Sequence, residues 1–285
     1  MLTTIDHLAL VVRDLDAATA QYSALLGCSP NWRGADGGAE HTWFQLTNMA
    51  LDLLSPSGPG PMGDRVRARL EQGEGIWAIA FATADTARMR HVLERRGVDS
   101  SVPRPNRSDV ESPAQRHSTM SALASEATHG TTLFLVQQQP DVPPWPRAIA
   151  HAASDACIAG LDHVVITTAH PERAVALYGA RLGLEMKLDR TNAERGSRLL
   201  FFKCGDAIVE IAHSLASDAS APHDLSPDKT WGISWRATDI AAAHARLQDA
   251  GFDVSDVRVG RKPGTHVFTI RNAPADVPTL VLGID

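Results

Sequence analysis

The chain has 285 residues, of which 44% are apolar and 21% are charged, and its formal net charge is −6. This is a globular composition, long enough to bury the cores of one large or two medium domains. The mild negative charge argues against nucleic acid or an anionic membrane as the main partner, and no apolar run approaches the roughly 20 residues of a membrane-spanning helix.

The N-terminus and the cysteines bear on the compartment. Residues 1–6 show no basic stretch followed by an apolar one, so we expect no signal peptide. Cys28, Cys157 and Cys204 are odd in number and widely spaced, unlike a disulfide framework. We therefore predict a cytoplasmic protein that works on a small molecule, with no nucleic-acid or membrane partner.

The first unit of the chain, residues 1–60, is predicted to form a strand, a helix and a hairpin. Residues 7–12 have the alternation of a strand. Asp14 is suited to cap a helix over residues 15–26, and Gly27 suits the position after its end. The hairpin strands are residues 41–46 and 49–54.

The second unit, residues 74–139, repeats this order. It begins with a strand over residues 76–83 and a helix over residues 86–96, and it ends with a strand over residues 131–137. Residues 100–130 between them are rich in Ser, Pro, Arg and His. Because this segment is long for a connection, we expect a lid or a mobile loop there.

A proline-rich segment, residues 140–157, is predicted to be a stiff linker to a second half, residues 158–285. The second half has two modules, at about residues 158–215 and 229–285, in the same order as the first. Its predicted elements are strands over residues 163–167, 198–203, 206–212, 232–237, 253–259, 265–271 and 279–284, and helices over residues 171–183 and 240–250.

The two halves are internal duplicates. An offset of 156 residues carries the Asp-His pair ending at His7 onto the pair ending at His163. An offset of 158 carries Asp52 onto Glu210, and an offset of 154 relates a further set of segments. The first half then spans residues 1–139, so each half contains two modules.

Four βαβββ modules, with Asp-His opening the first strand of a pair and an acidic residue in its last strand, resemble the vicinal oxygen chelate superfamily. That family includes glyoxalase I, extradiol dioxygenases and bleomycin resistance proteins. The resemblance covers nearly the whole chain, and it implies an α+β fold of two tandem domains with cupped mixed β-sheets. It also implies a ligand on each concave face and a divalent metal (Fe, Mn, Zn or Ni) held by His and Glu side chains.

On this pattern the candidate metal ligands are His163 and Glu210 in the second half, and His7 and Asp52 in the first. Glu210 is also the candidate catalytic acid or base. Because side chains alternate across a strand, Thr167 should share the concave face with His163. A structural role for either histidine, hydrogen-bonded to a neighbouring strand, is about equally well supported.

The partner modules do not supply the remaining ligands. Ala78 and Gly232 stand near the place of the family's first-strand histidine, and Phe134 and Val281 near that of its last-strand glutamate. Two ligands are too few for a firm transition-metal site. Each half could borrow a loop histidine, or modules one and three could face each other in one chain or across a homodimer, or the hollows could bind an organic ligand without metal. The loop histidines are His117, His129, His213 and His266.

The substrate pocket is predicted from aromatic and basic residues. One of Phe201 and Phe202 should line the concave face, and we assign Phe202, together with Thr167 and His266. Arg236 could reach the same hollow and would suit a carboxylate or phosphate, although a surface position at the strand end is the simpler interpretation.

Two pairs of duplicated residues are given structural roles. Asp6 and Asp162 are interpreted as strand-edge or turn residues. Trp77 and Trp231 have the opposite parity to the concave positions beside them, so we interpret both as packing residues.

The leading hypothesis for function is a small-molecule enzyme of the vicinal oxygen chelate type. By resemblance, a metal would bind two neighbouring oxygens of a small oxygenated substrate in lyase, isomerase or dioxygenase-like chemistry. The second half is favoured as the active one, since it carries Glu210 where the first has the shorter Asp52. The rival is a metal-free protein that sequesters a drug or metabolite, and a scaffold without catalytic role is a weaker third.

Overall fold

The computed structural model describes residues 1–107, 117–139, 146–216 and 226–284. The elements of the first half are β1 (Leu2–Val11), α1 (Leu15–Leu26), β2 (Cys28–Ser29), β3 (Trp32–Asp36), β4 (Ala39–Gln45), β5 (Ala50–Pro56), α2 (Pro61–Leu70), β6 (Gly75–Thr83), α3 (Thr86–Glu94), β7 (Arg104–Arg107), β8 (His117–Ala122) and β9 (Thr132–Gln138). Those that follow are β10 (Ile149–Ala150), β11 (Ile158–Thr167), α4 (Pro171–Ala174), η1 (Val175–Arg181), β12 (Glu185–Asn192), β13 (Ser197–Cys204), β14 (Ala207–Ser214), β15 (Lys229–Ala237), α5 (Ile240–Asp249), β16 (Arg258–Val259), β17 (Thr265–Ile270), η2 (Pro274–Asp276) and β18 (Thr279–Ile284).

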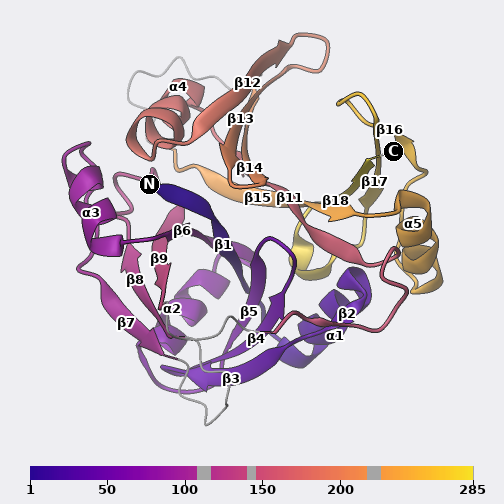
Figure 1. The fold of residues 1–285 in the computed structure, drawn as a ribbon, viewed down its shortest axis with the longest axis horizontal. Coiled ribbons are helices and arrows are strands. Elements are labelled where there is room, and N and C mark those ends of the chain that lie inside the picture. Colours follow the sequence, from indigo (N-terminus) through magenta and orange to yellow (C-terminus); the bar gives the residue numbers. More distant parts are fainter. Residues whose placement is uncertain (108–116, 140–145, 217–225, 285) are drawn as a thin grey trace.

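Two curled eight-stranded sheets form the molecule (Figure 1). The strand order is β3-β4-β5-β1-β6-β9-β8-β7 in the first and β12-β13-β14-β11-β15-β18-β17-β16 in the second. In each sheet the first strands of two consecutive modules, β1 and β6 or β11 and β15, lie antiparallel at the centre, and each pairs in parallel with the last strand of its own module. This confirms the predicted α+β fold of four modules in cupped mixed sheets.

Alternation along the strands separates two faces of each sheet. On β11, Val164 and Ile166 are fully buried in the main core cluster, which also contains buried residues of α1, η1 and α5. His163 and Val165 have the opposite parity and are outside that cluster. We call the face that carries His163, and its counterpart with His7 in the first sheet, the inner face.

Helix ends follow the predicted caps, with one difference. The Asp14 carboxylate accepts a hydrogen bond from the Ala17 amide at the start of α1, and Gly27 ends it at φ 76°. The helix predicted over residues 171–183 is a single α-helical turn, α4, followed by the π-helical segment η1. Helical periodicity cannot distinguish the two, because both place apolar residues on one side.

Several segments differ from the sequence expectations. The segment expected to be a loop, residues 100–130, contains strands β7 and β8 at the sheet edge, and its residues 108–116 lie outside the described ranges. Of the predicted linker, residues 140–145 lie outside them too, while β10 pairs with β2. Strands β3 and β12 and helix α2 were not predicted. No helix in the described parts of the chain is long and apolar enough to span a bilayer.

Helix α2 covers the inner face of the first sheet (Figure 1). Met62, Val66 and Leu70 recur at four-residue spacing and pack against Val11 and Leu54. Pro61 occupies the first helical turn, where its missing N–H costs nothing. No described helix covers the inner face of the second sheet, so the two duplicated faces differ in what lies over them.

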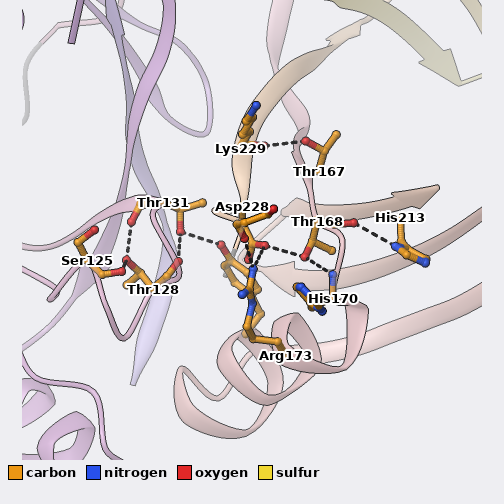
Figure 2. A network of polar contacts seen from close by, with 12 residues as sticks. Ser125, Thr128, Thr131, Thr167, Thr168, His170, Arg173, His213, Asp228 and Lys229 are labelled. Atoms are coloured by element: carbon orange, nitrogen blue, oxygen red, sulfur yellow. Dashed lines mark hydrogen bonds and ion pairs between the residues drawn. The ribbon is translucent and has the colours of Figure 1, made fainter. Parts of the chain in front are cut away.

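A buried polar network joins the two halves, and we call the ion pair at its centre the clasp (Figure 2). Arg173 Nη2 lies 2.7 Å from Asp228 Oδ1, and the same oxygen accepts a hydrogen bond of 2.6 Å from Thr168 Oγ1. The Asp228 amide donates to the carbonyl of His129, in the first half, at 2.8 Å. The clasp therefore ties the end of β11 and the start of β15 to the loop before β9.

Candidate active site on the second sheet

A β-bulge places two consecutive polar side chains on the same inner face. Leu161 pairs with Trp235 and His163 pairs with Ser234, so Asp162 is an extra residue on β11. Its carboxylate can then reach the neighbouring imidazole, and Asp162 Oδ1 lies 2.9 Å from His163 Nδ1. This differs from the strand-edge role expected for Asp162, because plain alternation would have placed the two side chains on opposite faces.

Glu210 completes the arrangement from the neighbouring strand. It pairs with Val165 on β11 and with Phe201 on β13. Its Oε2 lies 3.2 Å from His163 Nε2, so one imidazole has a carboxylate at each ring nitrogen. We call Asp162, His163 and Glu210 the triad. Its side chains are 22%, 15% and 12% exposed, which leaves them accessible although largely desolvated.

The two carboxylates have opposite electrostatic tendencies. Burial raises the pKa of Glu210, with a smaller upward push from Asp162, against the positive charges of His163 and Arg261. Burial would also raise the pKa of Asp162, but its hydrogen bond to His163, with the charges of Arg236 and Lys262, outweighs burial and lowers it. Asp162 therefore stays ionised at the pH at which Glu210 begins to take up a proton.

Arg236 lies near the end of β15, as expected, but beside the triad rather than free on the surface. Its Nη2 is 3.5 Å from Asp162 Oδ2 and donates to the Asp206 carbonyl at 2.9 Å. The side chain is 31% exposed, and its Nε is buried without a partner among the described residues. Its guanidinium therefore lies between Asp162 and Asp206, the residue at the β13–β14 turn.

The first half braces the bulge. Asn48, in the β4–β5 turn, donates to the Leu161 carbonyl at 2.8 Å and accepts from the Leu161 amide at 3.0 Å. A Cβ at Gly160 would lie 2.3 Å from the Asn48 carboxamide oxygen, so this approach requires glycine. Leu161, the residue before Asp162, is thus held by the Asn48 side chain of the first half.

Two residues assigned to the substrate pocket are corrected. Phe202 is fully buried in the core, with its ring 6.0 Å from that of Tyr178, so Phe201 is the inner-face member of the pair. His266 has the parity of Phe268, which is also fully buried in the core, so it faces away from the triad. Thr167 keeps the parity of His163 and donates to the Lys229 carbonyl at 3.4 Å.

A second bulge carries a tryptophan in both halves, but the two tryptophans differ in exposure. Val165 pairs with Gly232 and the next residue of β11 with Thr230, which leaves Trp231 as the extra residue on β15. The equivalent Trp77 in the first half packs partly buried against the inner-face cluster under α2. Trp231 is 52% exposed, contrary to the packing role expected for it.

The corresponding residues of the first half form a closed arrangement. His7 Nδ1 lies 2.7 Å from Asp6, but Asp52 pairs with His41, at 3.1 Å, rather than with His7. The Asp52 side chain is 7% exposed and that of His7 is 9% exposed, with Trp43 packed on the His7 ring at 4.9 Å. Burial opposes a charge on His41, yet Asp52 raises its pKa above the ordinary value.

The donor set does not fit a transition-metal site. Of the four predicted ligands, His163 and Glu210 approach each other on the second sheet, whereas catalytic sites normally use three protein ligands. His7 and Asp52 belong to the other sheet, and in the described parts of the chain no three His, Cys, Asp or Glu residues form a group that could hold a metal. The hypotheses of four ligands within one chain and of a borrowed loop histidine therefore find no support.

The fourth module shows why further ligands are missing. By the symmetry of the β11–β15 pair, Gly232 occupies the place of His163, and a Cβ there would lie 2.8 Å from the Pro278 carbonyl oxygen. The register places Leu280, rather than Val281, at the position of the family's glutamate. Neither position can supply a ligand, and we derive no step through a metal.

Comparisons with known proteins agree with this architecture. Residues 5–160 match the profile of a glyoxalase-like domain, and residues 162–269 match the Glyoxalase/Bleomycin resistance protein/Dioxygenase superfamily. The chain belongs to the glyoxalase-like domain family. This glyoxalase-like protein is therefore a tandem member of the vicinal oxygen chelate superfamily.

Solved structures and one curated relative extend the comparison. A mutant 4-hydroxymandelate synthase from Streptomyces coelicolor has a TM-score of 0.72 at 14% identity, covering 100% of this glyoxalase-like protein and 94% of that chain. A Mn(II)-bound glyoxalase from Novosphingobium aromaticivorans has a TM-score of 0.66 at 15% identity, with 99% and 82% covered. An ethylmalonyl-CoA/methylmalonyl-CoA epimerase from Cereibacter sphaeroides is 29% identical over 97 residues, which are 33% of this chain and 72% of the relative. The structural matches establish the fold alone.

Proposed function

We propose that this protein is an enzyme that moves a proton at a carbon next to a carbonyl or carboxylate group of a small organic substrate. The observation that supports this is the triad, in which the ring nitrogens of His163 lie 2.9 Å from Asp162 and 3.2 Å from Glu210. It lies on an inner face that no described helix covers. The curated relative named as an epimerase is consistent with such a proton transfer.

The triad assigns a role to each group. In this proposal the ionised Asp162 accepts a hydrogen bond from the Nδ1–H of His163 and so holds the imidazole with Nε2 directed at Glu210. Nε2 and the Glu210 carboxyl share a proton and form the acid–base pair. One of them breaks the substrate C–H bond, the electron pair moves to the neighbouring carbonyl oxygen, and the proton returns to the same or the adjacent carbon.

Solvent hydrogen exchange tests the proposal directly. The protein is dialysed against EDTA and incubated in D2O with a panel of acyl thioesters, 2-hydroxy acids and 2-oxo acids, and proton NMR follows loss of the signal at the carbon next to the carbonyl. Wild type should exchange at least one of them, and His163→Asn should slow the exchange by about 100-fold or more. His7→Asn, the same change in the duplicated half, is the matched control and should exchange at the wild-type rate.

Three outcomes would overturn it. The first is absence of exchange across the panel, and the second is an unchanged rate in His163→Asn. The third is exchange that disappears with EDTA and returns with Mn²⁺, which would assign the chemistry to a metal instead.

A second candidate is a protein that binds a small molecule without changing it. The observation in its favour is the exposed apolar surface beside the triad, where Trp231 is 52% and Leu188 is 46% exposed. Leu188 pairs with Phe201, which pairs with Glu210, so these side chains line one row of the inner face. Saturable binding of a panel compound without hydrogen exchange would favour this function.

A further inference from the structure

We propose that a hydrocarbon group of the substrate packs on Trp231 and occupies, on the second sheet, the space that α2 fills on the first. The inference deepens the proposed function and rests on it for the identity of the reacting site. The substrate would then carry an apolar group, aliphatic or aromatic, a few bonds from the carbon that exchanges its proton.

The strand registers show which positions of the two inner faces are equivalent. Val11 pairs with Leu54 in the first sheet, and Thr167 pairs with Ala212 at the same place in the second. In both sheets the first strand of the second module has a bulge whose extra residue is a tryptophan. The contacts of the first face can therefore be compared directly with those of the second.

Hydrocarbon side chains cover this part of the inner face in the first sheet. Val11, Leu54 and Trp77 belong to one apolar cluster with three side chains of α2, which are Met62, Val66 and Leu70. Val11 and Leu54 are almost completely buried as a result. The first half thus shows which chemistry this surface accepts, because its own chain supplies the occupant.

The equivalent surface of the second sheet is uncovered by any described helix. Thr167 and Ala212 are half-buried and Trp231 is exposed, although their counterparts in the first sheet are more deeply buried. Ala212 is also smaller than Leu54, which leaves room for a ligand where the first sheet has its own side chain. A hydrocarbon group bound there would remove the indole from water, and such burial is favourable.

Hydrogen bonds on both sides of Trp231 hold its bulge in place. Thr230 Oγ1 donates to the Ile76 carbonyl of the first half at 2.8 Å, and the Ile233 amide donates to the Pro278 carbonyl at 3.0 Å. The indole therefore projects from a fixed backbone. A binding surface that is already ordered loses less conformational entropy when the ligand arrives.

Strand pairing places this surface beside the triad. Glu210 pairs with Val165, which in turn pairs with Gly232. Trp231 is the residue before Gly232 on β15. Because adjacent strands lie about 4.8 Å apart, the Cα atoms of Glu210 and Trp231 are separated by roughly 10 Å. One small molecule can therefore present its reacting carbon to the triad and its hydrocarbon group to the indole.

Binding of simple carboxylic acids tests this without turnover. Isothermal titration calorimetry compares 3-phenylpropionate and hexanoate with propionate, which has the same carboxylate and a shorter hydrocarbon chain. Wild type should bind at least one of the larger acids about 10-fold or more tightly than propionate. Trp231→Ala and Ala212→Leu should each remove most of this preference, the first by deleting the apolar surface and the second by filling the space.

Two controls separate binding from folding. Trp77→Phe changes the equivalent tryptophan under α2, and it should alter the affinity by less than about twofold. Leucine is the residue at the equivalent position of the first sheet, so Ala212→Leu should melt close to the wild-type temperature. Whether 3-phenylpropionate or hexanoate binds more tightly identifies the hydrocarbon group as aromatic or aliphatic.

The outcomes distinguish the apolar site from the proton-transfer function. The apolar site is wrong if neither larger acid binds more tightly than propionate, or if Trp231→Ala or Ala212→Leu keeps the wild-type preference, even when hydrogen exchange occurs. If His163→Asn keeps the preference while losing exchange, both proposals stand. If the preference depends on Trp231 and Ala212 but no compound exchanges, the apolar site stands and the proton-transfer function fails.

Discussion

Replacing Asp228 by Asn removes the negative charge of the clasp while preserving the size of the side chain. The Asp228 side chain is 0% exposed and that of Arg173 is 20% exposed, with 2.7 Å between them. The variant leaves the Arg173 guanidinium without its counter-charge in a largely desolvated position. Its hydrogen bond of 2.9 Å to the Ser226 carbonyl remains.

The expected cost follows from this burial. Removing one partner of a buried ion pair costs about 3–5 kcal/mol. Because Arg173 is partly exposed and keeps one partner, we expect the lower end, about 3 kcal/mol of unfolding free energy, or roughly 6–12 °C in melting temperature. The matched control is Glu172→Gln on the same helix, since Glu172 binds Arg198 with its side chain 76% exposed. Glu172→Gln should lose less than about 1 kcal/mol of unfolding free energy.

Urea unfolding followed by tryptophan fluorescence measures both variants. The midpoint of Asp228→Asn should fall while the slope of the transition stays unchanged. If Asp228→Asn loses no more unfolding free energy than Glu172→Gln, the clasp does not stabilise the contact between the two halves as a buried ion pair.

Further predictions concern the triad and the duplicated tryptophans. The pKa of Glu210 is raised above its ordinary 4.5, so its contribution to folding stability is present below that pH and is lost as pH rises through the folded-state pKa. Glu210→Gln should therefore raise the melting temperature at pH 8 and not at pH 4. The pKa of Asp162 is lowered below 3.8, so its contribution is present above that pH and is lost as pH falls through the folded-state pKa; Asp162→Asn should lower the melting temperature at pH 8. Differential scanning fluorimetry from pH 4 to 8 measures both, and shifts of the same sign at pH 8 would contradict the assignment. Trp77→Ala should cost roughly 2–3 kcal/mol of unfolding free energy, because Trp77 packs between α2 and the sheet. Trp231→Ala should change that free energy by less than about 0.5 kcal/mol, since the Trp231 side chain is 52% exposed. Equal losses in urea unfolding would show that the two inner faces are equally covered.

The first half has two roles relative to the candidate site. Its own inner face is filled by α2, and Asp52 is engaged by His41 rather than by His7. Asn48 of the first half holds Leu161 in β11, and the loop before β9 holds Asp228 at the start of β15. Duplication has therefore left one sheet whose inner face is accessible and one that supports it.

Periodicity and turn chemistry were sufficient for the architecture. Buried residues such as Val164 and Ile166 recur at the spacing of a strand, and Asp14 and Gly27 mark the helix ends, because these signals are local. Helix α2 also has a local signal, in Pro61 and the four-residue spacing of Met62, Val66 and Leu70, although no helix was expected there.

The sequence by itself determined that the chain is a duplicated four-module α+β protein, and it singled out His163 and Glu210. Their adjacency followed from alternation in two paired strands of known order. Only the tertiary structure showed that Asp162 joins them and that Phe201 rather than Phe202 is on their face. The reason is physical: a β-bulge or a register shift reverses which face a side chain occupies, and it is decided by contacts between strands that are distant in the chain.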